Sequence, residues 1–365
     1  MRPLVLNHFA SSSSQLEPNA HMSSQQTDLP KTFKAAQIHE KGGKFQLVDV
    51  DWKNPERGQV VVKVLASGVC HSDSATVHQI IPGGLPRTPG HEIAGRIVQV
   101  GEGEQRFKVG DYVGSGWHGG HCGICQSCRR GDFVTCEKEN INGVLTDGGH
   151  SEYCVLRSEA LARLPDDLDP VQAAPLLCAG VTVFNSLRNM DIMPGDVVGV
   201  QGIGGLGSLA IGFANAAGYK VVALSQSGAK EELAKKLGAH IYVDGSKQDQ
   251  AEELQKLGGA KVILALAPNG DAMAKLLGGL AVGGQLLVIA LGDSLTVPMA
   301  PMIQKRLSIR GWPSGTAQDS EETVKFAQAQ NVECMCETFK LEQVQEAYDR
   351  MMDGKARFRC VLKMD

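Results

Sequence analysis

Between residues 196 and 312, stretches typical of buried strands alternate with stretches of helical length. The order is strand, helix, strand, helix and strand, written DVVGVQ, SLAIGFANAAGY, KVVALSQ, AKEELAKKLGA and HIYVD, and later strands follow at AKVILALA, GQLLVIAL and RLSIRGW. Strands joined through helices run parallel, and right-handed crossovers place the helices on both faces of the sheet. We therefore expect an α/β fold with a doubly wound parallel sheet, the Rossmann arrangement, over residues 181–317.

A glycine-rich turn, GIGGLG, follows the first of these strands and opens the first helix. Gly202 would permit the tight turn, Gly204 would let the backbone approach a pyrophosphate, and Gly207 would let the helix pack closely on the strand. The free N–H groups at the helix start would face the phosphate charge. We expect a dinucleotide cofactor to bind at Gly202, Gly204, Gly205, Leu206 and Gly207. The alternative is that the glycines only relieve crowding in the turn.

The end of the second strand bears on the choice between NAD(H) and NADP(H). A carboxylate usually stands there and accepts hydrogen bonds from the ribose of NAD, but this chain has Ser225 in the stretch ALSQSGAK. Ser225 and Ser227 could donate hydrogen bonds to a 2′-phosphate, and Lys230 would supply a positive charge. We expect NADP(H) to be favoured over NAD(H). Alternatively, the serines are solvated turn residues and Lys230 is a surface charge.

Four cysteines lie close together in the stretch HCGICQSCRRGDFVTCEK. Their spacing is C-x2-C-x2-C-x7-C, and they are Cys122, Cys125, Cys128 and Cys136. Tetrahedral zinc needs its sulfurs about 3.8 Å apart, which two-residue gaps allow. Disulfides or an iron–sulfur cluster are the alternatives, although the long last gap and the following Glu137 do not match the usual iron–sulfur pattern. We expect a closed, structural zinc lobe over residues 122–136.

A second set of metal-ligand types is spread along the chain. Cys70 lies in GVCHSD, His91 and Glu92 lie in GHE, and Cys178 lies in PLLCAGVTV. Two thiolates and one imidazole would leave one position of a tetrahedral zinc open, as catalytic zinc sites do. Glu92 could be a fourth ligand until substrate displaces it. The alternative is that the two cysteines are buried apolar thiols and His91 is a core histidine with satisfied hydrogen bonds.

The remaining segments predict a second domain. Residues 32–180 contain short β-rich runs, such as QVVVKVLASGV, IAGRIVQVG and EYCVLRS, between turn residues. Residues 318–365 contain a helical stretch near LEQVQEAYDRMMDGK and a strand RFRCVLKM, which could return to that domain. Residues 1–31 hold six serines before Pro30 and lack apolar periodicity, so we expect a flexible tail.

Composition excludes several classes of partner. With 42% apolar residues, 21% charged residues and a formal net charge of −4, the chain resembles neither a disordered nor a nucleic-acid-binding protein. The longest uncharged run, Val197–Tyr219, is rich in glycine and includes Gln201, so we expect no membrane span. Ten cysteines without a secretory signal fit a reducing, cytoplasmic location. Mitochondrial import is the alternative, since no acid precedes Glu17.

Taken together, these motifs resemble the zinc-dependent medium-chain alcohol dehydrogenases, especially the yeast and bacterial primary-alcohol type, from about Thr32 to the C-terminus. The resemblance implies a GroES-like catalytic domain beside the Rossmann domain, two zinc ions per chain and a homo-oligomer, a tetramer. It implies that Cys70, His91 and Cys178 hold the catalytic zinc, that Glu92 is the transient ligand, and that the clustered cysteines hold the structural zinc.

The resemblance also implies roles for residues around the metal. Ser72 would hydrogen-bond the substrate oxygen, His78 would pass the proton to solvent through the cofactor ribose, and Asp73 would orient His91. His71 and Arg359 would face the cofactor phosphates.

The substrate pocket departs from the yeast pattern. Ile81 in HQIIPGG stands where the yeast enzymes have a tryptophan, so we expect a substrate bulkier than ethanol. Trp117 would lie at the pocket wall or serve in packing.

The expected reaction is hydride transfer between the nicotinamide and a small-molecule alcohol, with an aldehyde or ketone as the other partner of the couple. A polyol or amino-alcohol dehydrogenase is one alternative. A non-catalytic, cofactor-binding redox sensor is the other.

Overall fold

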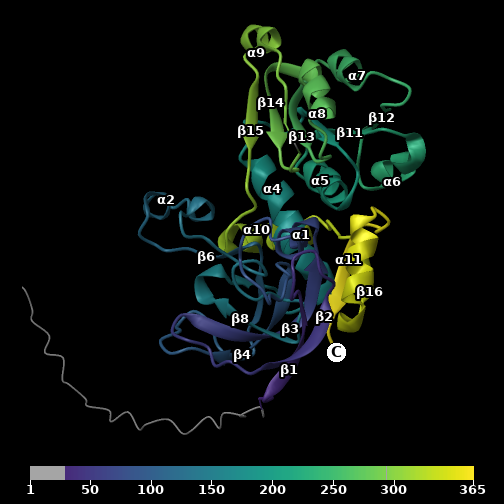
Figure 1. Ribbon diagram of the computed structural model, residues 1–365. Coiled ribbons are helices and arrows are strands. Elements are labelled where there is room, and N and C mark those ends of the chain that lie inside the picture. Colours follow the sequence, from purple (N-terminus) through teal and green to yellow (C-terminus); the bar gives the residue numbers. More distant parts are fainter. Residues whose placement is uncertain (1–28, 293) are drawn as a thin grey trace, which may run out of the picture. The chain divides into compact units, whose positions relative to one another are not determined.

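The computed structural model describes residues 29–292 and 294–365 (Figure 1). Residues Lys31–Asp365 form one compact unit. Nearly all of the tail expected over residues 1–31 lies outside the described residues. The compact unit contains a six-stranded parallel sheet and a seven-stranded mixed sheet, each with a buried apolar core.

The parallel sheet has the strand order β12–β11–β10–β13–β14–β15. Its strands are β10 (Val197–Gln201), β11 (Lys220–Ser225), β12 (Ile241–Asp244), β13 (Ala260–Ala265), β14 (Leu280–Val288) and β15 (Ser308–Gly311). Its helices are α5 (Gly205–Ala216), α6 (Glu231–Lys236), α7 (Gln250–Lys256), α8 (Gly270–Leu276) and α9 (Met299–Lys305). The chain winds outward from β10 to one edge, returns to the middle and winds outward to the other. The expected doubly wound sheet is confirmed.

Alternate residues of the central strands enter two separate cores. Val198 and Val200 of β10 pack in the core that α5 covers, whereas Val222 and Leu224 of β11 pack in the core that α7 and α8 cover. Successive side chains of a strand point to opposite faces, and a parallel sheet is buried on both. This double burial explains why the strands are almost continuously apolar in sequence.

The mixed sheet is built from the first and last parts of the chain, in the order β16–β17–β3–β4–β5–β9, and β8 also pairs with β3. Its strands are β3 (Gln59–Val69), β4 (Ile93–Val100), β5 (Tyr112–Ser115), β8 (Tyr153–Arg157), β9 (Ala162–Arg163), β16 (Cys336–Phe339) and β17 (Arg359–Lys363). Two small sheets accompany it: β1 (Thr32–Gln37) with β2 (Gln46–Asp51), and β6 (His118–Gly120) with β7 (Asn140–Ile141). Because β17 pairs antiparallel with β3, the C-terminal residues lie beside the strand that leads to Cys70.

A helical run over residues 170–188 joins the two sheets. It consists of α3 (Pro170–Pro175), the π-helical turn η4 (Leu176–Gly180) and α4 (Val181–Arg188). α3 packs against β3, and α4 packs against α5. Among the described residues this run is the one helix long and apolar enough to cross a membrane, but 72% of its apolar window is buried inside the molecule. Its apolar side chains pack in one core that also contains residues of both sheets, and this burial accounts for its composition.

The domain limits 32–180, 181–317 and 318–365 stay predictions. The limit between residues 180 and 181 falls inside this helical run.

Substitution of Phe213 on α5 tests the contact between the parallel sheet and the helical run. Its side chain is buried, and its ring centroid lies 5.2 Å from that of Phe184 on α4 and 6.0 Å from that of Phe326 on α10 (Ala317–Ala329). Phe213→Ala should lower the free energy of unfolding by about 3–5 kcal/mol, because it leaves a cavity. Val109→Ala, at an exposed site, should change it by less than about 0.5 kcal/mol. Denaturant titration of both variants compares the two effects, and equal effects would contradict this packing account.

Candidate active site

The end of β3 turns directly into the stretch that carries the first thiol. Cys70 has extended backbone and precedes the short 3-10 helix η1 (His71–Asp73) and α1 (Ser74–Val77). The Cys70 N–H donates a 2.9 Å hydrogen bond to Asp73 Oδ2, which closes the turn. The sequence GVCHSD therefore forms a tight corner, and this corner fixes Cys70 and Asp73 relative to each other.

The four residues expected at the catalytic metal come together. One ligand atom from each lies within 4.8 Å of all the others; they are Cys70, His91, Glu92 and Cys178. The two sulfurs are 4.0 Å apart. His91 and Glu92 immediately precede β4, and Cys178 lies in the π-helical turn η4. Turns of this kind are rare and recur at functional sites.

Unpaired polar atoms show that this cluster suits a metal ion. His91 and Glu92 are fully buried, yet His91 Nε2 and Glu92 Oε2 have no hydrogen-bond partner among the described residues. Buried polar atoms are nearly always paired. His91 Nδ1 lies 3.1 Å from Asp73 Oδ1, so the other ring nitrogen is available to an ion. Two thiols, an imidazole and a carboxylate are the ligand types that zinc prefers.

The charges of the cluster also favour a cation. The hydrogen bond from the Cys178 thiol, helped by His91, holds the pKa of Cys70 well below its usual range against the opposing effect of burial. Burial would raise the pKa of Asp73, but His91 and His150 hold it below its usual range. Burial raises the pKa of Glu92 to about 7, although Arg359 opposes the shift. In this site Cys70 is therefore inclined to be a thiolate and Asp73 a carboxylate.

Arg359 lies between the metal-ligand cluster and the glycine turn, where the sequence suggested a phosphate-facing position. The buried guanidinium donates through Nη2 to Glu92 Oε1. A Cβ atom added to Gly205 would lie 2.9 Å from Arg359 Nη1, so the arginine also reaches the start of α5. A Cβ on Gly68 would lie 1.9 Å from Glu92 Oε2, and a glycine is therefore required there.

The glycine turn has the shape expected for a pyrophosphate site. Gly202 has a φ of +87°, which side-chain-bearing residues rarely adopt. A Cβ on Gly207 would lie 1.9 Å from the Gly202 carbonyl oxygen, whereas a Cβ on Gly204 would meet nothing within 4 Å. Gly205 and Leu206 form the first turn of α5, where backbone N–H groups have no partner within the helix. The turn therefore fits a dinucleotide phosphate.

The side chains expected to bind a phosphate near the end of β11 differ in their exposure and in their contacts. Ser225 is half-buried and Ser227 is exposed. Lys230 Nζ donates a 2.7 Å hydrogen bond to the Ile203 carbonyl oxygen and lies 5.5 Å from the centroid of the Phe358 ring. Burial, together with Arg357, lowers the pKa of Lys230. The lysine thus lies against the glycine turn.

Asp244 is an acid that the sequence interpretation missed. It ends β12 and lies opposite Ser225 in the strand register. Its Oδ1 accepts hydrogen bonds from the Ser246 N–H at 3.0 Å and from Ser246 Oγ at 2.7 Å, and Lys247 Nζ lies 3.4 Å from Oδ2. The usual acid position at the end of the second strand holds Ser225, whereas the third strand supplies a carboxylate nearby.

The clustered cysteines form a compact four-sulfur site. Cys122 and Cys128 have sulfurs 4.0 Å apart, and the sulfurs of Cys125 and Cys136 are 3.9 Å apart. All four sulfurs lie within 4.8 Å of one another, at separations that suit tetrahedral zinc and exceed a disulfide bond. The backbone N–H groups of Ile124 and Cys125 lower the pKa of Cys122 to about 6, which favours a thiolate ligand.

Other expected site residues lie near the corner at Cys70. Ser72 is half-buried, while His71 and His78 are exposed. The Trp117 ring centroid lies 5.0 Å from that of His91 in an edge-on arrangement. Trp117 and Ile81 pack on a small apolar cluster formed by Ala75, Ile141 and Val144. An apolar wall therefore lies beside the metal-ligand cluster.

His150 and Ser67 also belong to the site, although no sequence motif singled them out. His150 Nε2 lies 3.3 Å from Asp73 Oδ2, and Ser67 Oγ lies 3.0 Å from His150 Nδ1. The only signal in the sequence is that a histidine stands in GGHSEY, just before a strand. Such a position cannot be tied to Asp73 without the fold.

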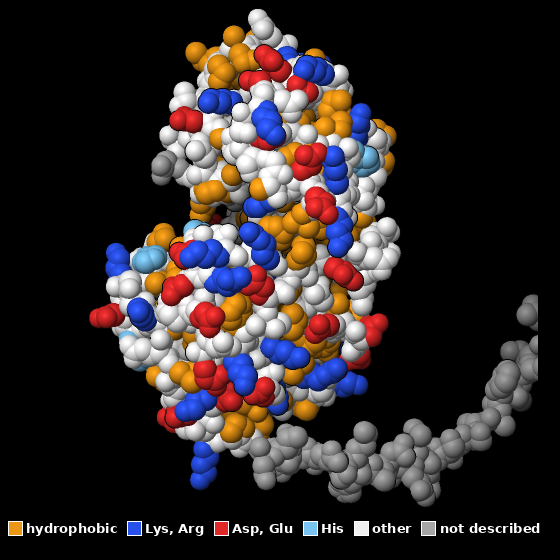
Figure 2. Space-filling model, turned by 90° about the vertical axis from the view of Figure 1, so that its right-hand side faces the viewer, with side chains coloured by type: hydrophobic (Ala, Val, Ile, Leu, Met, Phe, Trp, Pro, Cys, Tyr) orange, Lys and Arg blue, Asp and Glu red, His pale blue; other side chains and the backbone are white. Residues whose placement is uncertain are grey.

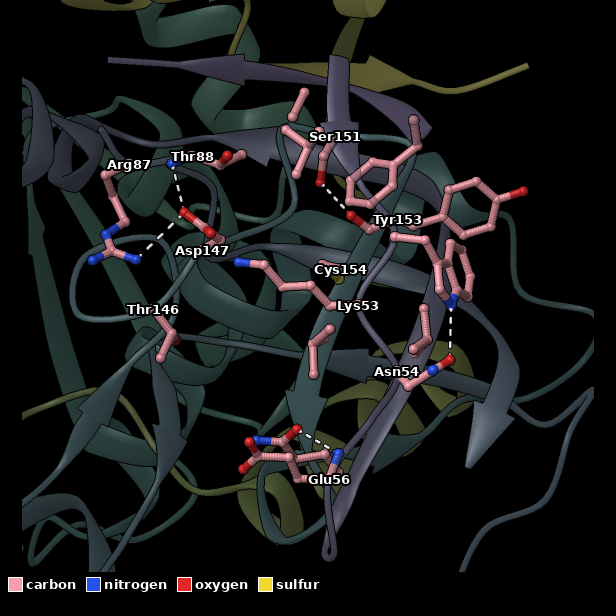
Figure 3. A pocket seen from close by; sticks show the side chains of 17 residues that line it. Lys53, Asn54, Glu56, Arg87, Thr88, Thr146, Asp147, Ser151, Tyr153 and Cys154 are labelled. Carbon is pink, nitrogen blue, oxygen red and sulfur yellow. Dashed lines mark hydrogen bonds and ion pairs between the residues drawn. The ribbon is translucent and has the colours of Figure 1, made fainter. Parts of the chain in front are cut away.

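A cavity of about 560 Å³ lies elsewhere in the β-rich part (Figure 3). Its walls include the aromatic residues Phe33, Trp52 and Tyr153, and the loop residues Asp147 and Ser151. None of the expected metal or cofactor residues lines it. The expected chemistry therefore belongs to the corner at Cys70.

Comparison with known proteins agrees with this geometry. Residues 56–166 match the alcohol dehydrogenase GroES-like domain, and residues 205–329 match the zinc-binding dehydrogenase family. Alcohol dehydrogenase patD from Penicillium expansum is 46% identical over 335 residues, which cover 92% of this chain and 98% of that protein.

Solved structures share the fold. CAD from Helicobacter pylori in complex with NADP(H) has a TM-score of 0.81 at 27% identity and covers 91% of this chain and 98% of its own. Acetophenone reductase from Geotrichum candidum in complex with NAD has a TM-score of 0.81 at 26% identity, and the match covers 92% of this chain and 98% of that protein. The expected GroES-like and Rossmann folds are thereby confirmed. The chain belongs to the zinc-binding, medium-chain alcohol dehydrogenase family.

Proposed function

We propose that this alcohol dehydrogenase uses a zinc ion held by Cys70, His91 and Cys178 to interconvert an apolar alcohol and its aldehyde or ketone, with NADP(H) as the preferred cofactor. The convergence of these three side chains with Glu92 supports the proposal most strongly. A redox sensor without turnover would not need this set, since the four-cysteine lobe already offers thiols. The lobe would hold a second, structural zinc ion.

At the catalytic site, zinc would act as a Lewis acid on the substrate oxygen. Asp73 would accept a hydrogen bond from the Nδ1–H of His91 and hold the ring in the ligating orientation. Glu92 would be the exchangeable fourth ligand. Its pairing with Arg359 supports this role, because the carboxylate stays neutralised inside the protein when it is displaced from the metal.

The cofactor would bind along the glycine turn and supply or accept the hydride. Ser225, Ser227 and Lys230 support NADP(H), because no carboxylate stands at the end of β11. Asp244 on the neighbouring strand is the observation that favours NAD(H), but Ser246 and Lys247 already engage its carboxylate. The two solved relatives hold NADP(H) and NAD, so the family fold accommodates either cofactor.

The proton would leave the substrate oxygen through Ser72 and reach solvent through His78. Ser72 is two residues from Cys70 on η1, and His78 follows α1 at the surface, where water reaches it. A proton route needs an end near the substrate and a solvated end, and the half-buried Ser72 and the exposed His78 would provide them. His71 and Arg359 would assist in holding the cofactor phosphates.

The substrate is proposed to be bulkier than ethanol and apolar. The wall beside His91 consists of Trp117, Ile81 and the apolar cluster that they contact. These side chains offer little hydrogen bonding to the extra hydroxyl or amino groups of a polyol or amino alcohol, so that alternative is disfavoured.

We also propose a homo-oligomer, a tetramer by family resemblance, in the cytoplasm. β15 is an edge strand of the parallel sheet, and Met299 and Ile303 on the nearby α9 are largely exposed. Hydrophobic side chains are visible at the top of Figure 2, the end at which Figure 1 shows α9. An unpaired strand edge beside exposed apolar residues is a natural surface for a second copy.

Cys178→Ser tests the catalytic ligand set. It should remove about one of two zinc ions per chain and lower kcat by about 100-fold or more, because a metal ligand is lost. Cofactor binding should stay close to wild type. Cys154→Ser, at another buried thiol, is the matched control and should keep both zinc ions. Zinc analysis and steady-state kinetics give the answer, and normal zinc content with full turnover in Cys178→Ser would refute the assignment.

Ser225→Asp tests the cofactor choice. Wild type should show a higher kcat/KM with NADPH than with NADH, and the variant should lower the NADPH value by about 10-fold or more through charge repulsion. Gln248→Asp adds the same charge at an exposed turn and should have little effect. A wild-type preference for NADH would overturn the NADP(H) proposal.

Ile303→Glu tests the proposed subunit contact. A charge placed in an apolar interface should shift the protein toward smaller species, because the charge would be desolvated on association. Val109→Glu, at an exposed residue of the β-rich part, should leave the assembly unchanged. Sedimentation velocity measures both; an Ile303→Glu variant that sediments like wild type would argue against this surface.

A further inference from the structure

The loop between β7 and β8 is fixed to the segment that precedes His91. Three consecutive N–H groups, those of residues 148–150, donate hydrogen bonds of 2.8 to 3.0 Å to the carbonyl groups of residues 88–90. Gly90 has a φ of +103°, and a Cβ on it would lie 2.6 Å from His150 Nδ1. Glycine at this position therefore lets the His150 ring lie against the backbone next to His91.

Some side chains of this loop line the cavity in Figure 3, whereas another lies beside Asp73. Asp147 and Ser151 line the cavity in Figure 3. The His150 ring is fully buried and lies with Nε2 3.3 Å from Asp73 Oδ2 and Nδ1 3.0 Å from Ser67 Oγ. Both ring nitrogens are thus engaged inside the protein, which would not be needed if the ring only filled space.

Asp73 is the point where His150 can influence the metal site. Asp73 Oδ1 lies 3.1 Å from His91 Nδ1, while Oδ2 accepts the Cys70 N–H at 2.9 Å and lies beside His150 Nε2. One carboxylate therefore contacts two residues of the metal-ligand cluster. A shift of Asp73 would move the ring of His91 and the turn at Cys70 together.

One assignment of protons is consistent with both hydrogen bonds of His150. Ser67 Oγ–H donates to His150 Nδ1, and His150 Nε2–H donates to Asp73 Oδ2. His91 Nδ1 lies 3.1 Å from the other oxygen of Asp73, which leaves His91 Nε2 for the metal. The tautomer of His150 is assigned from its partners.

We propose that His150, supported by Ser67, is a positioning residue for the catalytic metal: it holds Asp73 so that Asp73 orients His91 and the Cys70 turn. The inference rests on the zinc assignment under Proposed function. Residues beyond the direct ligands commonly tune metal affinity by about 10- to 100-fold, because they restrict the orientation of the ligands. The hydrogen bonds of His150 would have this effect through Asp73.

Three variants separate positioning from packing. His150→Phe keeps an aromatic ring but removes both hydrogen bonds. His150→Gln places an amide N–H donor near the former Nε2 position. Ser67→Ala removes the outer hydrogen bond alone. Ser186→Ala is the matched control, because Ser186 is equally buried and donates to a backbone carbonyl on α4, away from the metal sites.

Zinc affinity is the measurement, made by competition with a chelator of known affinity on the purified full-length protein. Cys178→Ser identifies the zinc of the four-cysteine lobe, which serves as an internal reference. His150→Phe should raise the Kd of the catalytic zinc by about 10- to 100-fold. His150→Gln should restore most of the affinity, Ser67→Ala should have a smaller effect than His150→Phe, and the lobe zinc should keep its affinity in all variants.

Several outcomes would overturn the inference. One is a catalytic-zinc Kd in His150→Phe that equals that of wild type. Another is an equal loss of affinity at both zinc sites, which would indicate general destabilisation. If His150→Phe does not fold, the comparison of Ser67→Ala with Ser186→Ala decides, and equal zinc affinities in that pair would refute the proposal. If the wild-type protein binds zinc only in the four-cysteine lobe, the zinc assignment under Proposed function is refuted as well. If the wild-type protein binds two zinc ions per chain and the variants keep its zinc affinity, this inference alone is refuted.

Discussion

The structure depends on a buried group of ligand atoms that is unfavourable without a cation. Two thiols, an imidazole and a carboxylate lie together, and three of their polar atoms lack hydrogen-bond partners in the described part of the chain. Burying such atoms costs several kcal/mol in total unless something pairs with them. A divalent ion removes that cost, so the corner at Cys70, the segment before β4 and the π-helical turn are best understood as parts of one metal site.

Arg359 connects this metal site to the cofactor turn. It pairs with Glu92 and lies against Gly205, although these residues are far apart in sequence. Its strand, β17, is held by β3, which leads to Cys70. The last strand of the chain therefore supplies the cation that neutralises the Glu92 carboxylate. A carboxylate with two alternative partners can change partner without becoming an isolated buried charge, which suits a ligand that exchanges with substrate.

Most of the fold was predictable from sequence, because strand and helix periodicity over residues 196–312 is strong and the glycine turn marks where the first helix begins. The metal-ligand groups were predictable because their residue types are chemically specific and the family motif relates their positions. Asp244 and His150 were not predictable, since their importance comes from contacts across strands and loops. The contact of Lys230 with the Ile203 carbonyl was missed for the same reason: a flexible lysine chain can reach several partners, and the sequence does not select one.

Three positions at or just after the end of β3 each contribute differently to the proposed metal site. Ser67 contacts His150, Gly68 makes room for Glu92, and Cys70 supplies a sulfur. β3 is held on one side by β4 and on the other by β17. Because side chains alternate between faces, inserting or deleting a single residue here would turn every one of these groups away from its partner. Natural variants that keep this site are therefore expected to keep the length of this strand.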